Sequence, residues 1–164
     1  MGFTAGFTGK EIKRLIEKHG GTCKFISLDE GYSRINLKIS SQSETAVNGT
    51  GPHIPPDKLQ ELMQQIDGIA AGDTLVLAGS IPADIPDDMY EQILKRLQGR
   101  DIHIAVDATG DLLKKVIKYR PFLIKPNHLE LGELFHAELH TEEEITICAK
   151  RLQAMGARNV LVSR

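Results

Sequence analysis

Apolar residues recur at two different spacings along the chain, and the spacing changes near residue 56. Before that point, residues 8–19 carry apolar side chains at the helical period, whereas residues 32–39 alternate between apolar and polar positions. After it, apolar helix stripes alternate with short apolar runs such as TLVLA at 74–78, which are typical of strands buried on both faces. This alternation of strands and helices predicts parallel β-α-β units in an α/β fold.

The pattern defines a series of elements. The expected strands cover residues 22–28, 32–39, 44–48, 74–78, 102–106, 122–124 and 159–163, and the expected helices cover 8–19, 59–66, 89–97, 110–119, 128–135 and 141–155. Two helix starts have the spacing of a capping box, Thr8 with Glu11 and Thr141 with Glu144. The turn-forming residues 29–31 predict a hairpin between the first two strands.

The early strands interrupt the α/β order and are too short to form a domain of their own. We therefore interpret residues 22–50 as a small antiparallel lid on an α/β body, with residues 1–21 as the start of that body and residues 51–164 as the rest. The body pattern begins within glycine-rich residues and stops directly after a strand without a covering helix. We expect a body that is incomplete at both ends.

Composition narrows the classes of function. The 164 residues contain 20 Lys and Arg against 22 Asp and Glu, which is not expected of a protein that binds nucleic acid or an anionic membrane. No apolar run is long enough to cross a bilayer, and the 5% aromatic content without Trp does not favour base stacking. The two cysteines, Cys23 and Cys148, form no disulfide framework or metal motif, which favours a reduced, cytoplasmic compartment.

Candidate chemistry follows the predicted body strands. Ligands of open parallel sheets bind beyond the carboxyl ends of the strands. Polar residues at those ends are Ser80, Asp107, Lys125, Asn127 and Ser163. Two interpretations of Asp107 stay open: it caps the next helix, or its carboxylate holds a cation or a substrate hydroxyl.

Lys125, Asn127 and Glu130 surround the start of the helix at 128–135. In one interpretation Asn127 and Glu130 only cap that helix. In the other, a Lys, an amide and a carboxylate at a helix N-terminus suit a phosphate with its Mg²⁺.

The predicted lid carries a second group of polar residues. Arg34, Asn36 and Lys38 share one face of the strand at 32–39. That face is either a solvated edge or an anion-binding surface on which the Arg grips a phosphate with two hydrogen bonds.

Six stretches, in this order and spacing, together resemble the ribokinase-like phosphofructokinase B (PfkB) family of sugar kinases. They are GFTAGFTGKEI (2–12), YSRINLKI (32–39), ETAVNGTGP (44–52), LAGSIPADIPDDMY (77–90), VDATGDLLKKV (106–116) and PFLIKPNHLELGELF (121–135). The resemblance implies a Rossmann-like parallel sheet flanked by helices with a small antiparallel β lid. It also implies ATP-dependent phosphorylation of a sugar phosphate with Mg²⁺. Within the family the chain is most similar to the 1-phosphofructokinases, which convert fructose 1-phosphate to fructose 1,6-bisphosphate, and next to the tagatose-6-phosphate kinases.

The resemblance also implies roles for single residues. It assigns the sugar phosphate to Arg34, Asn36, Lys38, Asn48 and Ser80, the nucleotide to Lys125, Asn127 and Ser163, and the metal ion to Asp107 and Glu130. The expected partners are a sugar phosphate, ATP and a second copy of the chain through the lid, with no nucleic acid and no membrane.

The family's Gly-Ala-Gly-Asp segment, which supplies the catalytic base and the anion hole, does not occur in the 164 residues and is expected after Arg164. No residue of this chain is therefore assigned as catalytic, and we expect the chain alone to be inactive. A non-catalytic phosphosugar- or nucleotide-binding domain is the competing interpretation. A dinucleotide-dependent dehydrogenase is disfavoured, because no G-x-G-x-x-G follows a predicted strand.

Overall fold

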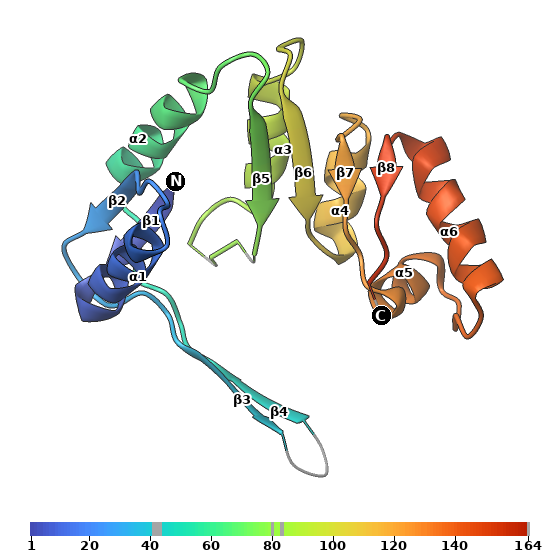
Figure 1. Ribbon diagram of the computed structural model, residues 1–164, viewed down its shortest axis with the longest axis horizontal. Coiled ribbons are helices and arrows are strands. Elements are labelled where there is room, and N and C mark those ends of the chain that lie inside the picture. The colour runs from blue at the N-terminus through green and yellow to red at the C-terminus, as the bar shows by residue number, and fades with distance from the viewer. Residues whose placement is uncertain (41–43, 80, 83, 164) are drawn as a thin grey trace. The chain divides into compact units, whose positions relative to one another are not determined.

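The computed structural model describes residues 1–40, 44–79, 81–82 and 84–163. The chain forms two compact units, Met1–Ile66 and Asp67–Arg164 (Figure 1). Helix α2 (Pro56–Asp67) closes the first unit, and its last residue opens the second. No helix in the described part of the chain combines the length and apolarity needed to span a membrane.

The second unit is built on four parallel strands. These are β5 (Thr74–Ala78), β6 (His103–Asp107), β7 (Leu123–Ile124) and β8 (Asn159–Val160), paired in chain order. Between them run α3 (Met89–Arg96), α4 (Gly110–Ile117), α5 (His128–Phe135) and α6 (Glu142–Met155). The predicted parallel body strands are confirmed.

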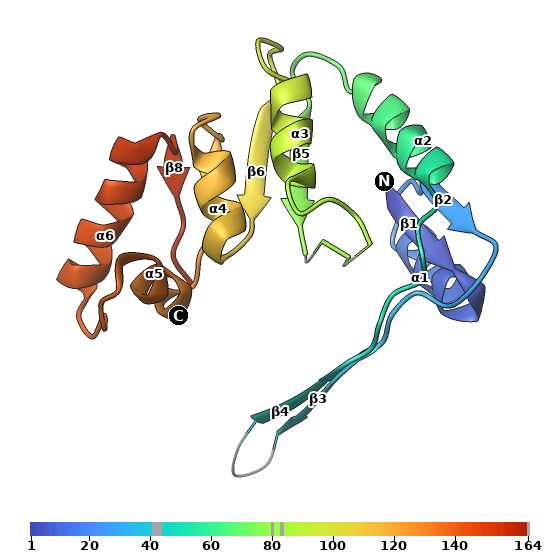
Figure 2. The ribbon, with the colours of Figure 1, turned by 180° about the vertical axis from the view of Figure 1, so that it is seen from behind.

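The core of this unit lies on one face of the sheet. Leu77, Val106 and Ile124 are in register across three strands and are at most 7% exposed. Helices α3 and α4 cover the same face of the sheet, as Figure 2 shows. The prediction that residues 74–78 are buried on both faces is wrong, because Val76 is 61% exposed. An apolar run alone does not say which face receives a helix.

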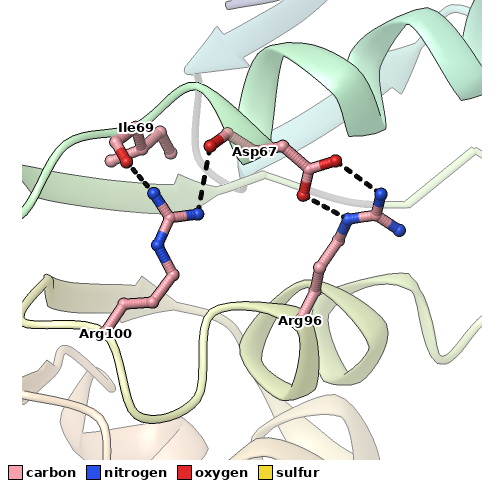
Figure 3. Close-up of polar contacts among 4 residues, drawn as sticks. All are labelled: Asp67, Ile69, Arg96 and Arg100. Atoms are coloured by element: carbon pink, nitrogen blue, oxygen red, sulfur yellow. Dashed lines mark hydrogen bonds and ion pairs between the residues drawn. The ribbon is translucent and has the colours of Figure 1, made fainter.

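A cluster of arginines joins residues at the start of this unit to α3 and the loop after it (Figure 3). Arg96 donates two hydrogen bonds of 2.5 Å to the carboxylate of Asp67. Arg100 donates to the backbone oxygens of Asp67 and Ile69. These carbonyls lie at and just beyond the end of α2, where helix carbonyls lack partners within the helix.

The first unit contains a parallel β-α-β motif and a separate hairpin. Strands β1 (Gly2–Ala5) and β2 (Phe25–Leu28) pair in parallel, and α1 (Gly6–Lys18) connects them. Strands β3 (Asn36–Ser40) and β4 (Glu44–Asn48) form an antiparallel ribbon. The predicted hairpin between 22–28 and 32–39 is therefore wrong, because residues 25–28 pair with a strand that precedes α1.

The start of α1 also differs from the prediction. The helix begins at Gly6, and its N-cap, Ala5, has no side-chain capping bond. Thr8 lies inside the first turn, where its hydroxyl donates to Ser33 O at 2.9 Å. The capping box predicted for Thr8 and Glu11 is thus absent, because the helix begins two residues before Thr8 and the Glu11 carboxylate accepts hydrogen bonds from Arg14 instead. The second predicted box, Thr141 with Glu144, is present at α6.

Candidate functional site

The predicted polar residues meet at the carboxyl edge of the four-stranded sheet. Asp107 ends β6, and Lys125 directly follows β7. Asn127 and Ser163 form a parallel bridge beyond the ends of β7 and β8. The predicted gathering at one edge is confirmed for Asp107, Asn127 and Ser163, because their strands run in the same direction. Ser80 lies outside the described residues.

Asp107 and Lys125 form an ion pair between neighbouring strands. Lys125 Nζ lies 3.4 Å from Asp107 Oδ2, and about two-fifths of each side chain is exposed. Solvent therefore weakens this pair, which leaves both groups available to an incoming ligand. The N-cap of α4 is Thr109, so the interpretation of Asp107 as a helix cap is wrong.

Tyr90 supports the strand end beside Asp107 and was not among the predicted site residues. Its side chain is buried, and its hydroxyl donates to Gly79 O at 3.0 Å. Burial raises the pKa of the Tyr90 hydroxyl, and the negative charge of Asp107 raises it further. The phenol therefore stays protonated and holds the residue just before Ser80. Its only sequence signal was its place at the end of the stretch at 77–90.

Asn127 and Glu130 form a complete capping box at the start of α5. Glu130 N–H donates to Asn127 Oδ1 at 2.8 Å, and Asn127 N–H donates to Glu130 Oε2 at 2.7 Å. The amide of His128 donates to Ser163 O at 2.9 Å. Two of the first three helix amides thus already have partners within the chain. A phosphate bound here would therefore depend on Lys125 and other side chains more than on free backbone donors.

The interpretation of Asn127 and Glu130 as a helix cap is confirmed, but the cap does not occupy every polar atom of these two side chains. Within the described chain, the cap takes Oε2 of Glu130 and Oδ1 of Asn127, and it leaves Oε1 and Nδ2 for other contacts. No group of three or more His, Cys, Asp or Glu side chains gathers as a metal site within that part of the chain. The carboxylates of Asp107 and Glu130 still suit Mg²⁺, which commonly takes one or two carboxylates and completes its shell with phosphate and water.

The residues predicted for the lid lie in the first unit. Asn36 is paired with Asn48 across the ribbon, and Lys38 lies two positions after Asn36 on the same face. Leu37 and Val47 are paired on the opposite face. Arg34 precedes β3, which starts at Asn36 rather than at residue 32 as predicted. Its position therefore depends on the segment that leads into the ribbon.

The profile of the pfkB family of carbohydrate kinases matches residues 1–164. The chain is 37% identical over 99% of its length to the 1-phosphofructokinase of Bacillus subtilis, and 37% identical over its whole length to the D-tagatose-1-phosphate kinase of Bacillus licheniformis. It spans 54% of each of these relatives. A crystal structure of a Staphylococcus aureus protein assigned as a phosphofructokinase aligns with a TM-score of 0.80 at 35% identity, covering 98% of this chain and 52% of that one.

These comparisons correct one prediction and confirm two others. Two of the relatives are named D-tagatose-1-phosphate kinases. The predicted similarity to tagatose-6-phosphate kinases is therefore not supported. The ribokinase-like α/β fold with a small antiparallel sheet is confirmed. The family predicted from the six sequence stretches is confirmed as well: the chain belongs to the pfkB family of carbohydrate kinases.

Proposed function

We propose that the protein acts in the ATP-dependent phosphorylation of a ketohexose 1-phosphate, with fructose 1-phosphate as substrate and fructose 1,6-bisphosphate as product. The observation that carries this proposal is the 37% identity to a curated 1-phosphofructokinase along 99% of the chain. The chain spans about half the length of the curated relatives it matches, so the activity is proposed for the whole protein.

The names of the relatives support a phosphate on carbon 1. Fructose and tagatose differ only in the configuration at carbon 4, and both relatives are named for the 1-phosphate of their sugar. A site shared by these enzymes would recognise a C1 phosphate and direct the reaction to the C6 hydroxyl. Discrimination between the two sugars would then depend on contacts at carbon 4.

The lid supplies the groups for the sugar phosphate in this proposal. Arg34 can hold two phosphate oxygens in its fork, and Lys38 adds a second positive charge on the ribbon face shared with Asn36 and Asn48. Ser80, which follows β5 in the sequence, is proposed to contact the sugar.

The carboxyl edge of the sheet supplies the groups for ATP and its metal ion. Asp107 and Glu130 would hold Mg²⁺, and Lys125, Asn127 and Ser163 would contact the nucleotide phosphates. When bound, Mg²⁺ neutralises charge on the phosphoryl group that is transferred. The existing Asp107–Lys125 pair suits this role, because it already presents a carboxylate and an ammonium group side by side.

A second candidate is a binding domain without turnover. Such a domain would hold a sugar phosphate or ATP through the same residues without transferring a phosphate. Both candidates use ATP or a sugar phosphate, ligands that occur in the cytoplasm. The free thiols of Cys23 and Cys148 suit that compartment.

Calorimetric titration of the purified chain tests the proposal. We expect weak binding of fructose 1-phosphate, and Arg34→Ala should weaken it roughly 10- to 150-fold because a charge-assisted contact is lost. The affinity of Arg34→Lys for fructose 1-phosphate should lie between those of the wild type and Arg34→Ala. The affinity for Mg²⁺-ATP should change far less in both variants. Equal losses for both ligands would mean that Arg34 maintains structure instead.

Two further measurements complete the test. Fructose 6-phosphate should bind more weakly than fructose 1-phosphate, and equal affinities would contradict recognition of a C1 phosphate. The chain alone, incubated with ATP, Mg²⁺ and fructose 1-phosphate, should release no ADP above background. Sustained release by a preparation free of contaminating kinase would place a catalytic base within these 164 residues and exclude the binding-domain candidate.

A further inference from the structure

The segment that leads into the lid is fastened to the first turn of α1. This lid joint consists of Tyr32 and Ser33 on one side and Gly6, Thr8 and Gly9 on the other. Ser33 is only 9% exposed, although it directly precedes the exposed Arg34. The proposed function uses none of these five residues, so their arrangement needs its own explanation.

Ser33 is held on β1 by a reciprocal pair of hydrogen bonds. Its Oγ accepts from Ala5 N–H at 3.0 Å, and its own N–H donates to Ala5 O at 3.0 Å. Ala5 is the last residue of β1 and the N-cap of α1. The place of Ser33 is thus tied to the rigid junction between a strand and a helix.

Thr8 fixes the other side of Ser33. Its hydroxyl donates to Ser33 O at 2.9 Å. The carbonyl oxygen of Ser33 and the backbone nitrogen of Arg34 belong to the same peptide group, which is planar and rigid. The hydroxyl of Thr8 therefore orients the peptide through which the chain enters Arg34.

Two glycines allow the segments to approach this closely. A Cβ on Gly9 would lie 2.8 Å from Thr4 Cβ and 3.0 Å from Ser33 Oγ. Gly6 has φ +58°, and a Cβ there would lie 2.7 Å from Gly31 O and would also collide with the ring of Tyr32. The ring of Tyr32 packs edge-on against Phe7, with ring centroids 5.4 Å apart.

We propose that the lid joint positions Arg34 for the substrate phosphate, and that Thr8 and Ser33 are positioning residues of the sugar-phosphate site. This inference rests on the proposed function, in which Arg34 contacts the phosphate. It gives a role to the contact between the stretch Gly6-Phe7-Thr8-Gly9 and the dipeptide Tyr32-Ser33, which are far apart in the sequence. It also explains how Arg34, which lies outside β3, reaches a defined position.

The test compares two substitutions at Thr8 in the whole chain. Thr8→Val keeps the shape of the side chain and removes the hydroxyl, whereas Thr8→Ser keeps the hydroxyl. We expect Thr8→Val to speed amide exchange at Ala5 and Ser33 and to weaken fructose 1-phosphate binding roughly two- to tenfold, the net effect of one hydrogen bond. Thr8→Ser should keep the amide exchange rates and the fructose 1-phosphate affinity of the wild type. Thr22→Val, the same change at an exposed threonine, is the control and should alter neither.

A double-mutant cycle with Arg34→Ala separates positioning from general stability. If Thr8 acts through Arg34, Thr8→Val should cause no further loss of fructose 1-phosphate affinity once Arg34 is replaced. Additive losses would overturn the proposal, and so would unchanged amide exchange in Thr8→Val. If Arg34→Ala alone leaves the affinity unchanged, the proposed role of Arg34 fails, and faster exchange in Thr8→Val would then show that the joint exists without serving that site.

Discussion

The carboxylate of Asp67 has a well-defined electrostatic environment. Its hydrogen bonds from Arg96 lower its pKa below the usual aspartate value. Loss of solvent around the carboxylate opposes this shift, and the charges of Arg96 and Arg100 lower the pKa further. Asp67 and Arg96 are each nearly half exposed, so solvent limits how much the pair stabilises the fold. The pH dependence of the pair is nevertheless well defined in sign.

Asp67→Asn should change the pH dependence of stability. Because folding lowers the pKa of Asp67, the ionised carboxylate stabilises the fold above the ordinary aspartate pKa of about 3.9. That contribution is lost as the pH falls through the lower pKa of the folded state. The wild type should therefore exceed the variant in free energy of unfolding at neutral pH, and the difference should shrink below about pH 4. Urea unfolding at a series of pH values measures it.

Asp101→Asn serves as the control for this experiment, since it removes an exposed carboxylate from the same unit. A difference for Asp67→Asn that persists unchanged to about pH 3 would contradict the assigned cause. An equal effect of Asp101→Asn would attribute the change to net charge rather than to the arginine contact.

Helices α5 and α6 begin with the same capping motif in different surroundings. Asn127 with Glu130 caps α5 at the carboxyl edge of the sheet, and Thr141 with Glu144 caps α6. In α6 the amides of His140 and Thr141 lower the pKa of Glu144, as expected for a carboxylate that accepts backbone hydrogen bonds. The two helices thus allow the cap to be separated from any contact with a ligand.

Asn127→Ser should separate the two roles of that residue. Serine is as good an N-cap as asparagine, so stability should stay within about 0.5 kcal/mol of the wild type. The amide Nδ2 is lost, however, and Mg²⁺-ATP should bind roughly two- to tenfold more weakly if it contacts that group. Thermal unfolding and calorimetric titration measure the two effects.

Thr141→Ala provides the matched control. It should lower stability by about 1 kcal/mol through loss of the cap, with no change in Mg²⁺-ATP affinity. If Asn127→Ser binds Mg²⁺-ATP as tightly as the wild type, Asn127 is a cap alone and its assignment to the nucleotide must be dropped.

At the scale of the whole molecule, the ribbon of β3 and β4 has one polar and one apolar face. Leu37 and Val47 are directly paired on the apolar face and are 55% and 56% exposed, and Ile39 beside them is 48% exposed. A two-stranded ribbon is marginally stable alone, and exposed apolar side chains that lie together favour a partner surface. The predicted pairing with a second copy of the chain through the lid would cover them.

Leu37→Lys should weaken this self-association. The lysine places a charge at the centre of the apolar face, where it would have to be desolvated on association. Sedimentation equilibrium should show a lower proportion of dimer, while circular dichroism stays the same.

Ile147→Lys makes the same change at a position of α6 that is 59% exposed, and it should leave the proportion of dimer unchanged. A wild-type chain that stays monomeric at high concentration would rule out pairing through the ribbon.

The sequence alone determined the features that depend on local chemistry. The parallel strands of the body followed from apolar runs separated by helices, and the capping boxes at Asn127 and Thr141 followed from the spacing of residues within one helical turn. The edge shared by Asp107 and Asn127 followed from strand direction alone, because parallel strands end on the same side. The family followed from the order and spacing of six motifs.

Only the tertiary structure decided which distant residues are partners. Residues 25–28 are β-prone in either pairing, so the sequence pattern did not reveal that they pair with β1. Thr8 had the spacing of a capping residue, yet its hydroxyl bonds to Ser33. Tyr90 carried no local sign that it would donate to Gly79 O. Periodicity reports how a segment is exposed along its own axis, whereas these contacts depend on where the fold brings other segments to it.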